Sequence, residues 1–518
     1  MGTSRTNEPV AISAIDLPDS GQFLVQDCNE CDCACAVASQ ESILRGNLIL
    51  GELPPGEQLV RGTAIFECAL DEEHFVLFHT AGSGQAVVVN QPAYQIFRAF
   101  DWPTTVPAGR VAAAREMVGD IDGVLARLYS ASVIQRVQER AGPPFAEPNS
   151  SQSSLTAWLH VSNACNLACP YCYVNKSASA MDEPTGIAAV DTVLRSAAAH
   201  GFAAVKLKYA GGEASLNRDL VLRLDGYARS RAAGLGLRFD AVLLSNGLRL
   251  SSAFVDVLKA SGVKIMISLD GVGAAHDAQR PTVAGKPSFI SVERTIRRLC
   301  AVGHPPHLSV TITARNAAGI ADVVRFALEA GLTFSLNFFR DNECAASFAD
   351  LRYSEAAMID GMRAAFKVIE ENLPPWSVLG SVLDRGQLLQ PRQRPCGVGQ
   401  DYVVIDHEGK VAKCHMEIER TLGDVFRDDP VQLVRNDTRT TLNLLVDEKE
   451  GCRDCSWKYW CSGGCPVATF RASGRYDVKS PNCGIYQAIY PEALRLEGLR
   501  LLKYATHLGV MGAEAPQN

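Results

Sequence analysis

Six apolar segments recur along the middle of the chain, each followed by a stretch with helical periodicity. The apolar segments are near-continuous rather than alternating, which is typical of parallel strands buried on both faces. They cover residues 155–162, 204–211, 239–247, 264–271, 307–316 and 333–341. Helical periodicity covers residues around 185–200, 217–233, 251–261, 288–302 and 317–330, with further helices at about 354–372 and 488–506. Strands that alternate with helices predict an α/β fold, either a barrel-like arrangement or a doubly wound sheet.

Polar residues gather where these predicted strands end. Gly211-Gly212-Glu213 ends the second strand and Ser245-Asn246-Gly247 ends the third, while Ser268, Asp270 and Asn316 follow later ones. Folds of this class place their ligand sites at the carboxyl ends of parallel strands. The pattern therefore predicts a site at this edge of the sheet.

A smaller unit precedes the alternating region. Residues 72–80 and 85–91 predict two strands joined by a glycine turn, and residues 92–100, 109–118 and 121–134 predict three helices. Residues 142–154 are rich in Pro, Ser and Asn, which predicts a linker. Residues 1 to about 60 lack sustained periodicity, so we expect them to be irregular.

Composition places the chain among ordinary globular proteins. Hydrophobic residues make up 47% and charged residues 21% of the 518 residues, and the net charge of −7 gives no support for binding nucleic acid or an anionic membrane. No run of about 18 apolar residues predicts a membrane span. The first residues also lack the apolar segment of a signal peptide, so we expect a cytoplasmic protein.

Cysteine is the residue type whose distribution changes this picture. Of 17 cysteines, four lie between Cys28 and Cys35, three between Cys165 and Cys172, and seven between Cys396 and Cys483. Tight clusters in a chain without a secretion signal favour metal ligands over disulfides.

The motif Cys165-x3-Cys169-x2-Cys172 directly follows the first predicted strand of the alternating region. This spacing lets one loop wrap an iron–sulfur cube, and three thiolates leave one iron free to bind another ligand. The alternative is a zinc site completed by His160, although zinc ribbons usually pair two CxxC knuckles.

The motif and the strand-end residues together resemble the radical S-adenosylmethionine (SAM) superfamily over about residues 155–345. The resemblance implies a partial (β/α)6 TIM-like barrel with a [4Fe–4S] cluster on Cys165, Cys169 and Cys172. It also implies SAM contacts from Tyr171 (adenine), Gly212 and Glu213 (methionine ammonium), Ser268 (ribose), Arg280 (methionine carboxylate) and Leu336 (adenine). In that superfamily, one electron cleaves SAM to a 5′-deoxyadenosyl radical that abstracts hydrogen from an unactivated C–H bond.

The third cysteine cluster resembles the SPASM domain, an auxiliary-cluster module of radical SAM enzymes that modify peptides and proteins. Its pattern is Cys396, Cys414, Cys452-x2-Cys455-x5-Cys461-x3-Cys465 and Cys483, with a predicted hairpin at 402–414. The resemblance implies one cluster on Cys452, Cys455, Cys461 and Cys483 and another on Cys396, Cys414 and Cys465, hence three [4Fe–4S] clusters in all. Zinc ribbons are the alternative, but seven thiolates suit zinc poorly without an eighth ligand.

The sequence departs from the related sulfatase maturases at two positions. Those enzymes have a cysteine shortly before the position of Cys396 and a catalytic Asp after the position of Cys414. Here no cysteine occurs between Cys344 and Cys396, and His415 follows Cys414. Either His415, Cys344 or a cysteine of the 28–35 tract closes the cluster, or one iron stays open to a substrate thiolate, sulfur or water. Sulfatase-type formylglycine formation is therefore kept only as an alternative function.

Two N-terminal features bear on the substrate. The unit at 73–140 resembles the winged-helix-like precursor-recognition element of peptide maturases, which binds a leader peptide as an added strand. The alternative is an inert structural domain. The run DCNECDCACAV at 27–37 has three explanations: a solvent-accessible tail, a labile metal site, or a fused precursor-like segment that the enzyme itself modifies.

These resemblances predict a radical SAM peptide maturase that leads to a thioether or C–C cross-link, or to an oxidation, in a ribosomal peptide or protein. The expected partners are that precursor and a flavodoxin- or ferredoxin-type electron donor, with neither nucleic acid nor membrane. A non-catalytic iron–sulfur electron carrier is the alternative, and such a carrier has no need of a SAM pocket. The expected divisions are 1–60 (irregular, Cys-rich), 61–141 (precursor recognition), 142–154 (linker), 155–345 (radical SAM core), 346–389 (helical bridge), 390–490 (SPASM) and 491–518 (C-terminal helix and tail).

Overall fold

The computed structural model describes residues 10–13, 56–82, 84–114, 121–137 and 154–507. The cysteine run at 27–37 and, apart from Ser154, the expected linker lie outside these residues.

The largest element is a nine-stranded sheet with the order β13-β12-β11-β10-β9-β8-β14-β15-β16. Its parallel part consists of β8 (Ser154–Ser162), β9 (Ala204–Gly211), β10 (Arg238–Ser245), β11 (Lys264–Ser268), β12 (His307–Ile312) and β13 (Phe334–Phe338). Each of these strands pairs in parallel with the next one in the chain. The predicted α/β class and the positions of all six strands are confirmed.

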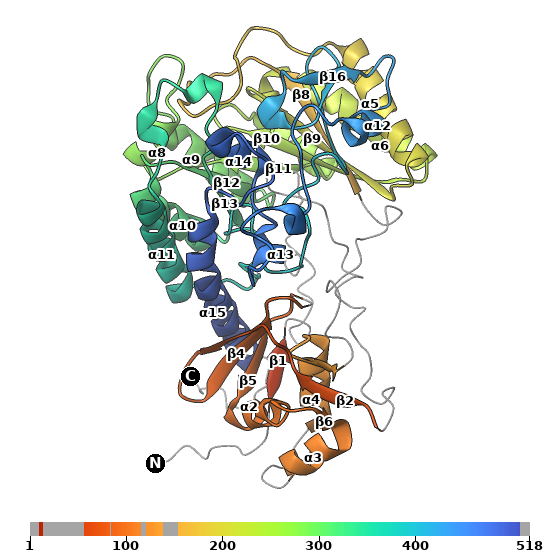
Figure 1. Cartoon of the computed structure of the whole chain (residues 1–518). Helices are drawn as coiled ribbons and strands as arrows, with labels where there is room; N and C mark the ends of the chain where they lie inside the picture. The colour runs from red at the N-terminus through yellow and green to blue at the C-terminus, as the bar shows by residue number, and fades with distance from the viewer. Residues whose placement is uncertain (1–9, 14–55, 83, 115–120, 138–153, 508–518) are drawn as a thin grey trace.

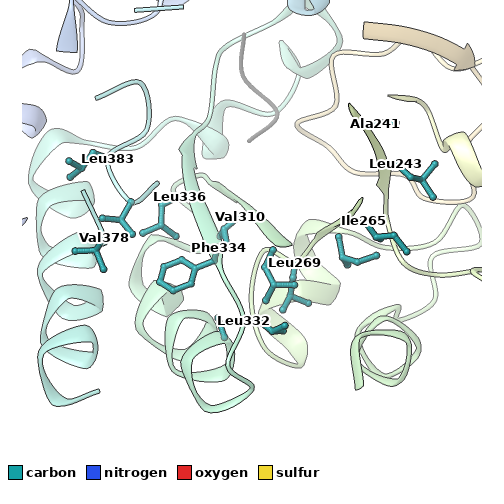
Figure 2. Close-up of a cluster of buried hydrophobic side chains, with 14 of the residues drawn as sticks. Ala241, Leu243, Ile265, Leu269, Val310, Leu332, Phe334, Leu336, Val378 and Leu383 are labelled. Atoms are coloured by element: carbon teal, nitrogen blue, oxygen red, sulfur yellow. The ribbon is translucent and has the colours of Figure 1, made fainter. Parts of the chain in front are cut away.

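Helices connect and cover these strands (Figure 1). They are α5 (Glu183–Ala199), α6 (Arg218–Gly234), α7 (Ser252–Ala260), α8 (Ala274–Gln279), α9 (Phe289–Ala301), α10 (Ile320–Glu329) and α11 (Glu355–Glu371). Local signals fix where they begin: the Asp182 side chain accepts the Thr185 N–H ahead of α5, and Ser251 does the same for Phe254 ahead of α7. Figure 2 shows the apolar layer that results, with Leu243, Ile265 and Val310 among the buried side chains.

The cysteine-rich region is joined to this sheet rather than tethered beside it. Its strand β14 (Tyr402–Ile405) pairs in parallel with β8, and β15 (Lys410–Ala412) and β16 (Thr421–Asp424) follow in antiparallel order. The hairpin predicted at 402–414 is confirmed by the pairing of Val404 with Ala412. The region also contains α12 (Pro430–Asn436), α13 (Lys458–Cys461) and α14 (Pro466–Ser473).

The N-terminal unit has more strands than its sequence pattern indicates. Its sheets have the orders β1-β5-β4-β3 and β6-β2-β7. The strands are β1 (Ala11–Ser13), β2 (Gln58–Arg61), β3 (Ile65–Ala69), β4 (His74–His79), β5 (Val87–Asn90), β6 (Thr104–Thr105) and β7 (Ile134–Arg136), and the helices are α2 (Gln91–Arg98), α3 (Val106–Ala114) and α4 (Ile121–Ser130). The two expected strands, β4 and β5, and the presence of the three helices are confirmed. The third helix ends at Ser130 rather than at residue 134, because Ile134 belongs to β7, and residues 115–118 of the second expected helix lie outside the described residues.

The other five strands of this unit were not predicted. They have two to five residues each, too few for a period of two to stand out. Two of them, β1 and most of β2, lie inside the stretch expected to be irregular, so that expectation is wrong for residues 11–13 and 58–60.

A long helix, α15 (Cys483–His507), runs from the cysteine-rich region to the N-terminal sheet (Figure 1, blue). It begins at Cys483, about five residues earlier than its periodicity predicts. Beside it, the Trp460 indole donates to the Thr80 carbonyl at 2.6 Å and its ring lies 4.9 Å from that of Phe78. One hydrophobic core therefore joins the N-terminal sheet to the rest of the chain. Within the described ranges, no helix is both long and apolar enough to cross a membrane.

Candidate functional site

A pocket opens at the carboxyl ends of the parallel strands, where the sequence predicts a site. Its lining includes nearly all of the predicted residues at that edge: Cys165, Cys169, Tyr171, Cys172, Gly212, Glu213, Ser268 and Arg280. Residues from the cysteine-rich region and the segment before it complete the wall, among them Arg340, Arg385, His415 and Met416. Two parts of the sequence that are far apart thus face one another across a single pocket.

The loop that carries the first three cysteines is fixed on both sides. Lys176 donates to the Leu167 carbonyl at 2.8 Å, and the Ala168 amide donates to the Pro281 carbonyl at 2.8 Å. The second bond ties the loop to the segment directly after Arg280. The loop and the arginine are therefore held in one arrangement before any ligand binds.

The three thiols on this loop interact electrostatically with one another. Burial raises the pKa of Cys165, Cys169 and Cys172, and the positive charge of Lys176 opposes that rise at each thiol. A thiol with a raised pKa becomes a thiolate when a metal centre replaces its proton. Three half-buried thiols of this kind around one pocket fit an iron–sulfur cluster.

A single zinc ion is the alternative for this loop. In the part of the chain that the structure describes, no three His, Cys, Asp or Glu side chains converge closely enough to hold one metal ion. Ligands of an iron–sulfur cube bind different irons, so they need not converge in this way. His160, the expected fourth zinc ligand, does not line the pocket, and its Nε2 lies 2.6 Å from Asn163 Oδ1.

The GGE motif packs against the chain that leads into the cysteine loop. A Cβ on Gly212 would lie 2.6 Å from the carbonyl oxygens of Asn163 and Ala164, so only glycine fits there. The Glu213 carboxylate accepts the Ser245 hydroxyl at 2.8 Å and the Asn246 amide at 2.7 Å. Each carboxylate oxygen has two acceptor positions, so Glu213 keeps acceptor capacity for a cationic ligand.

Asp270 connects two of the predicted SAM contacts. The Tyr171 hydroxyl donates to its carboxylate, and Arg280 donates both to that carboxylate, at 3.2 Å, and to the Tyr171 oxygen. The Thr311 amide donates to the other oxygen of Asp270 at 2.8 Å. The sequence places Asp270 among the polar residues at strand ends but indicates no role for it. Its position two residues after Ser268, at a strand end, was the available signal.

Ser268 and Leu336 occupy different environments. Ser268 is half-buried and lines the pocket at the end of β11. Leu336 is fully buried in the core beneath the pocket, close to Val310 and Leu383 (Figure 2). Successive side chains of a strand point to opposite faces, so the next residue, Asn337, lines the pocket instead.

Cys396, Cys414 and Cys465 form a second, deeply buried group, each at most 8% exposed. Burial raises the pKa of Cys396 and Cys414, and the charges of the neighbouring thiols add to the rise. Burial also acts on Cys465, but the guanidinium groups of Arg340 and Arg385 outweigh it and hold the pKa of that thiol below its usual value. The three segments that carry these cysteines therefore meet at one point beside the pocket.

Cys452, Cys455, Cys461 and Cys483 form a third group near the surface. Burial raises the pKa of Cys452 to about 11 and that of Cys461 to about 12, and the other thiols of the group add to both shifts. Gln487 Nε2 lies 3.7 Å from Cys483 Sγ and 3.9 Å from Cys455 Sγ. Cys455 also lines a solvent-facing hollow with Trp457 and Gln487.

His415 lies between the first and second groups. Its ring stacks on Trp158 with centroids 4.6 Å apart, and its Nδ1 lies 2.9 Å from the Tyr402 hydroxyl. Burial lowers the pKa of His415 well below its usual value, so the ring is neutral. Cys344, another candidate to close the second cluster, is exposed, and its Sγ lies 3.5 Å from the Tyr173 carbonyl.

Arg385 is a pocket residue that sequence analysis missed. It is 7% exposed, and its Nε and Nη1 have no hydrogen-bond partner among the residues that the structure describes. The adjacent Asp384 does not neutralise it, because that carboxylate is bound to Arg340 at 2.7 Å and accepts the Phe338 amide and the Tyr486 hydroxyl, each at 2.9 Å. No cysteine spacing or strand pattern marks residue 385, which explains why it was missed.

The pocket has two sides: the cysteine loop and the strand-end residues form what we call the first wall, and the residues around the cysteine-rich region form the second wall. Comparison with known families supports the geometry of the first wall. Residues 159–327 match the model of the Radical SAM superfamily. The chain contains a radical SAM domain. The matched region holds the cysteine loop, the GGE motif, Ser268 and Arg280, and the predicted family resemblance is confirmed.

Individual relatives agree with this assignment. The chain is 30% identical over 178 residues to the sporulation killing factor maturation protein SkfB of Bacillus subtilis, covering 34% of this chain and 40% of that protein. It is 25% identical over 352 residues to the PqqA peptide cyclase of Xanthomonas euvesicatoria pv. vesicatoria, covering 64% of this chain and 87% of that protein. Its fold matches anSMEcpe, solved with bound AdoMet and the Cp18Cys peptide, with a TM-score of 0.55 at 18% identity over 68% of this chain and 99% of that chain.

Proposed function

We propose that this chain is a radical SAM peptide maturase. It reductively cleaves SAM and uses the 5′-deoxyadenosyl radical to remove hydrogen from a residue of a ribosomal peptide or protein, leading to a cross-link or an oxidation. The observation that carries the proposal is the single pocket, which has the cysteine loop and strand-end motifs on one wall and the cysteine-rich region on the other. The names of the relatives, a peptide cyclase and a maturation protein, support the substrate class.

The residues of the first wall have distinct roles in this proposal. Cys165, Cys169 and Cys172 hold a [4Fe–4S] cluster, which supplies the electron and an open iron when it is bound. Gly212 and Glu213 receive the methionine ammonium, and Tyr171, Ser268 and Arg280 contact the rest of SAM. Leu336, which is buried beneath the pocket, acts on the adenine only through the residues above it.

Asp270 is a positioning residue in the same proposal. It holds Tyr171 and Arg280 in place through its hydrogen bonds, so that SAM meets a preformed site.

The other two cysteine groups hold auxiliary clusters in this proposal. Cys396, Cys414 and Cys465 lie beside the pocket and would hold a cluster there, which would bind a substrate sulfur if one of its irons lacked a protein ligand. Cys452, Cys455, Cys461 and Cys483 lie near the surface, where a flavodoxin- or ferredoxin-type donor delivers electrons. The chain then carries three [4Fe–4S] clusters and works in the cytoplasm, where thiols stay reduced.

Two alternatives are less well supported. A sulfatase-type maturase would use the residue after Cys414 as a base, but burial lowers the pKa of His415, which makes it a weak proton acceptor, and its ring is stacked on Trp158 and bonded to Tyr402. An electron carrier would have no use for a pocket that joins Tyr171, Glu213, Ser268 and Arg280 to three cysteines.

Formation of 5′-deoxyadenosine tests the proposal. After anaerobic reconstitution, the wild-type chain should produce it from SAM with dithionite as reductant. The triple variant Cys165→Ala, Cys169→Ala, Cys172→Ala should produce none. Cys300→Ala, which changes a lone cysteine on α9, serves as the matched control and should keep full activity. Equal production by the triple variant would refute the assignment of the cysteine loop.

A further inference from the structure

Two cationic side chains are buried among the cysteines of the second and third groups. Arg385 is 7% exposed and Lys449 is fully buried. Among the residues that the structure describes, Arg385 Nε and Nη1 have no partner, and Lys449 Nζ has one hydrogen bond, to the Ser462 carbonyl at 3.2 Å. Neither cation is paired with a carboxylate there. A buried charge is costly unless an opposite charge lies nearby, so each of these cations needs an anion.

The backbone holds Arg385 away from the nearest carboxylate. The preceding residue, Asp384, has a φ of 52°, in the left-handed region that residues other than glycine rarely adopt. Its side chain is bound to Arg340 and Tyr486. The Arg385 carbonyl accepts the Arg392 Nη2 at 2.7 Å, which fixes the following turn of chain. Asp384 therefore serves Arg340, and the charge of Arg385 is left for another partner.

The thiols nearest to Arg385 belong to the second group. Its guanidinium opposes the rise in pKa that burial causes at Cys396, and together with Arg340 it lowers the pKa of Cys465. The charge of Arg340 is already balanced by Asp384, which leaves Arg385 as the unbalanced cation of this pair. The second group is thus the source of negative charge that Arg385 can meet.

Lys449 lies in a space that the loop between Cys461 and Cys465 leaves for it. In that loop Gly463 has a φ of 74°, and a Cβ on it would lie 2.5 Å from Lys449 Cδ and 2.7 Å from Nζ. Glycine lets the loop close over the lysine side chain. The Ser462 carbonyl in the same loop accepts the Lys449 ammonium. The loop is therefore built around a buried cation.

Lys449 faces thiols of both groups. Burial lowers its pKa, and the charges of four thiols oppose that shift; they are Cys452 and Cys461 of the third group and Cys396 and Cys465 of the second. Arg385 is not among the charges that act most strongly on the pKa of Cys452, Cys461 or Cys483. The two cations thus differ in reach: Arg385 lies beside the second group, and Lys449 lies between the second and the third.

We propose that Arg385 and Lys449 are the counter-cations of the auxiliary clusters, Arg385 for the second cluster alone and Lys449 for the second and third together. This role rests on the proposed function for the assignment of a cluster to each cysteine group. A thiolate-bound iron–sulfur cluster is an anion, and reduction adds one more negative charge to it. A fixed cation nearby therefore stabilises the reduced form more than the oxidised form and raises the reduction potential.

A reductive titration followed by electron paramagnetic resonance tests this role. It uses the full-length chain with Cys165→Ala, Cys169→Ala and Cys172→Ala, reconstituted anaerobically, because these changes remove the first cluster and its signal. The signal of the second cluster is the one that disappears when Cys396→Ala, Cys414→Ala and Cys465→Ala are added. The ratio of reduced to oxidised cluster is then compared between variants at one fixed potential.

The two cations should give different patterns. Arg385→Met should lower the ratio at least tenfold for the second cluster, a shift of about 59 mV for a one-electron couple, and leave the third within about twofold. Lys449→Met should lower the ratio for both clusters. Arg439→Met removes a cation of the same region that is 83% exposed, so it serves as the control and should change neither ratio.

Arg385→Lys separates the charge from the guanidinium group. It keeps the positive charge and should bind the second cluster with a ratio close to that of the parent chain. If Arg385→Met does not bind these four irons, Arg385→Lys should still bind them, and loss of the irons from both variants would overturn the proposal. An Arg385→Met variant with full iron content and an unchanged ratio would overturn it as well, and so would equal shifts at both clusters.

Formation of 5′-deoxyadenosine by the chain with intact Cys165, Cys169 and Cys172 tests the proposed function separately. Unchanged ratios in a protein whose parent chain forms 5′-deoxyadenosine would refute the counter-cations and leave the proposed function standing. Shifted ratios in a protein whose parent chain forms none would refute the proposed function and leave the counter-cations standing. A reconstituted chain that binds no cluster at the second and third groups would overturn the counter-cation role.

Discussion

Two groups of three cysteines flank the pocket, and the chain assembles them in different ways. Cys165, Cys169 and Cys172 come from one short loop after β8, while Cys396, Cys414 and Cys465 come from three segments that meet only in the folded chain. Their charged neighbours differ as well. Arg280 beside the first group is paired with Asp270 and keeps one buried donor, Nε, without a partner among the described residues. Arg385 beside the second group has two such donors, Nε and Nη1, and the neighbouring carboxylate of Asp384 is paired with Arg340 instead.

The largest effect is expected from breaking the charge pair of the first wall. Asp270→Ala leaves Arg280 buried without its carboxylate and should lower the free energy of unfolding by about 4 kcal/mol. Urea unfolding of the cluster-free protein measures this. Asp350→Ala removes a carboxylate that is 63% exposed and paired with Arg315, so it serves as the control and should leave the free energy of unfolding almost unchanged. Similar losses in both variants would mean that the Asp270 network is not structural.

Substitutions of the two arginines of the second wall should change the free energy of unfolding in opposite directions. Arg340→Met removes the partner of the buried Asp384 and should destabilise the cluster-free protein by about 3 kcal/mol. Arg385→Met removes two buried donors that lack partners and should stabilise it by about 1 kcal/mol. The same unfolding assay compares the two variants. A loss of stability in Arg385→Met would show that this guanidinium is satisfied within the fold.

The smallest expected effect is a pH dependence of stability that comes from His276, which is hydrogen-bonded to the backbone of Asp270. His276 is fully buried, its Nδ1 accepts the Asp270 amide, and burial lowers its pKa to about 3. Below the ordinary His pKa the unfolded chain binds a proton that the folded chain does not, so stability falls as pH drops from about 6.5 toward 3. At about pH 5.5 the wild type should have lost about 1 kcal/mol more than His276→Asn, relative to neutral pH. Parallel unfolding curves for the two proteins across this range would contradict the assignment.

The sequence predicts the first wall well because its signals are local. Cys165, Cys169 and Cys172 are close in the chain, so their spacing already encodes their geometry. The strand ends at Gly212 and Ser268 follow from long apolar runs whose class and order the structure confirms. Leu336 is a predicted contact that does not line the pocket, whereas the next residue, Asn337, does, because successive residues of a strand face opposite sides of the sheet.

Other features depend on tertiary structure and leave no local pattern. Arg385 is distinctive only because Asp384 is already bound to Arg340 in the folded chain. The strand β1 has three residues, and its pairing with β5 spans more than seventy residues of sequence. Nothing in residues 11–13 alone distinguishes a buried strand from an irregular segment, so only the folded sheet shows it.

In the proposed function, the two cysteine groups hold separate clusters, and only the first cleaves SAM. The most direct measurement takes iron content and 5′-deoxyadenosine yield together in the triple variant Cys396→Ala, Cys414→Ala, Cys465→Ala. The wild type should contain about twelve irons per chain, four in each of three clusters. The variant should contain about eight irons and still convert SAM to 5′-deoxyadenosine. A variant that keeps all its iron, or one that keeps the first cluster yet forms no 5′-deoxyadenosine, would contradict the account.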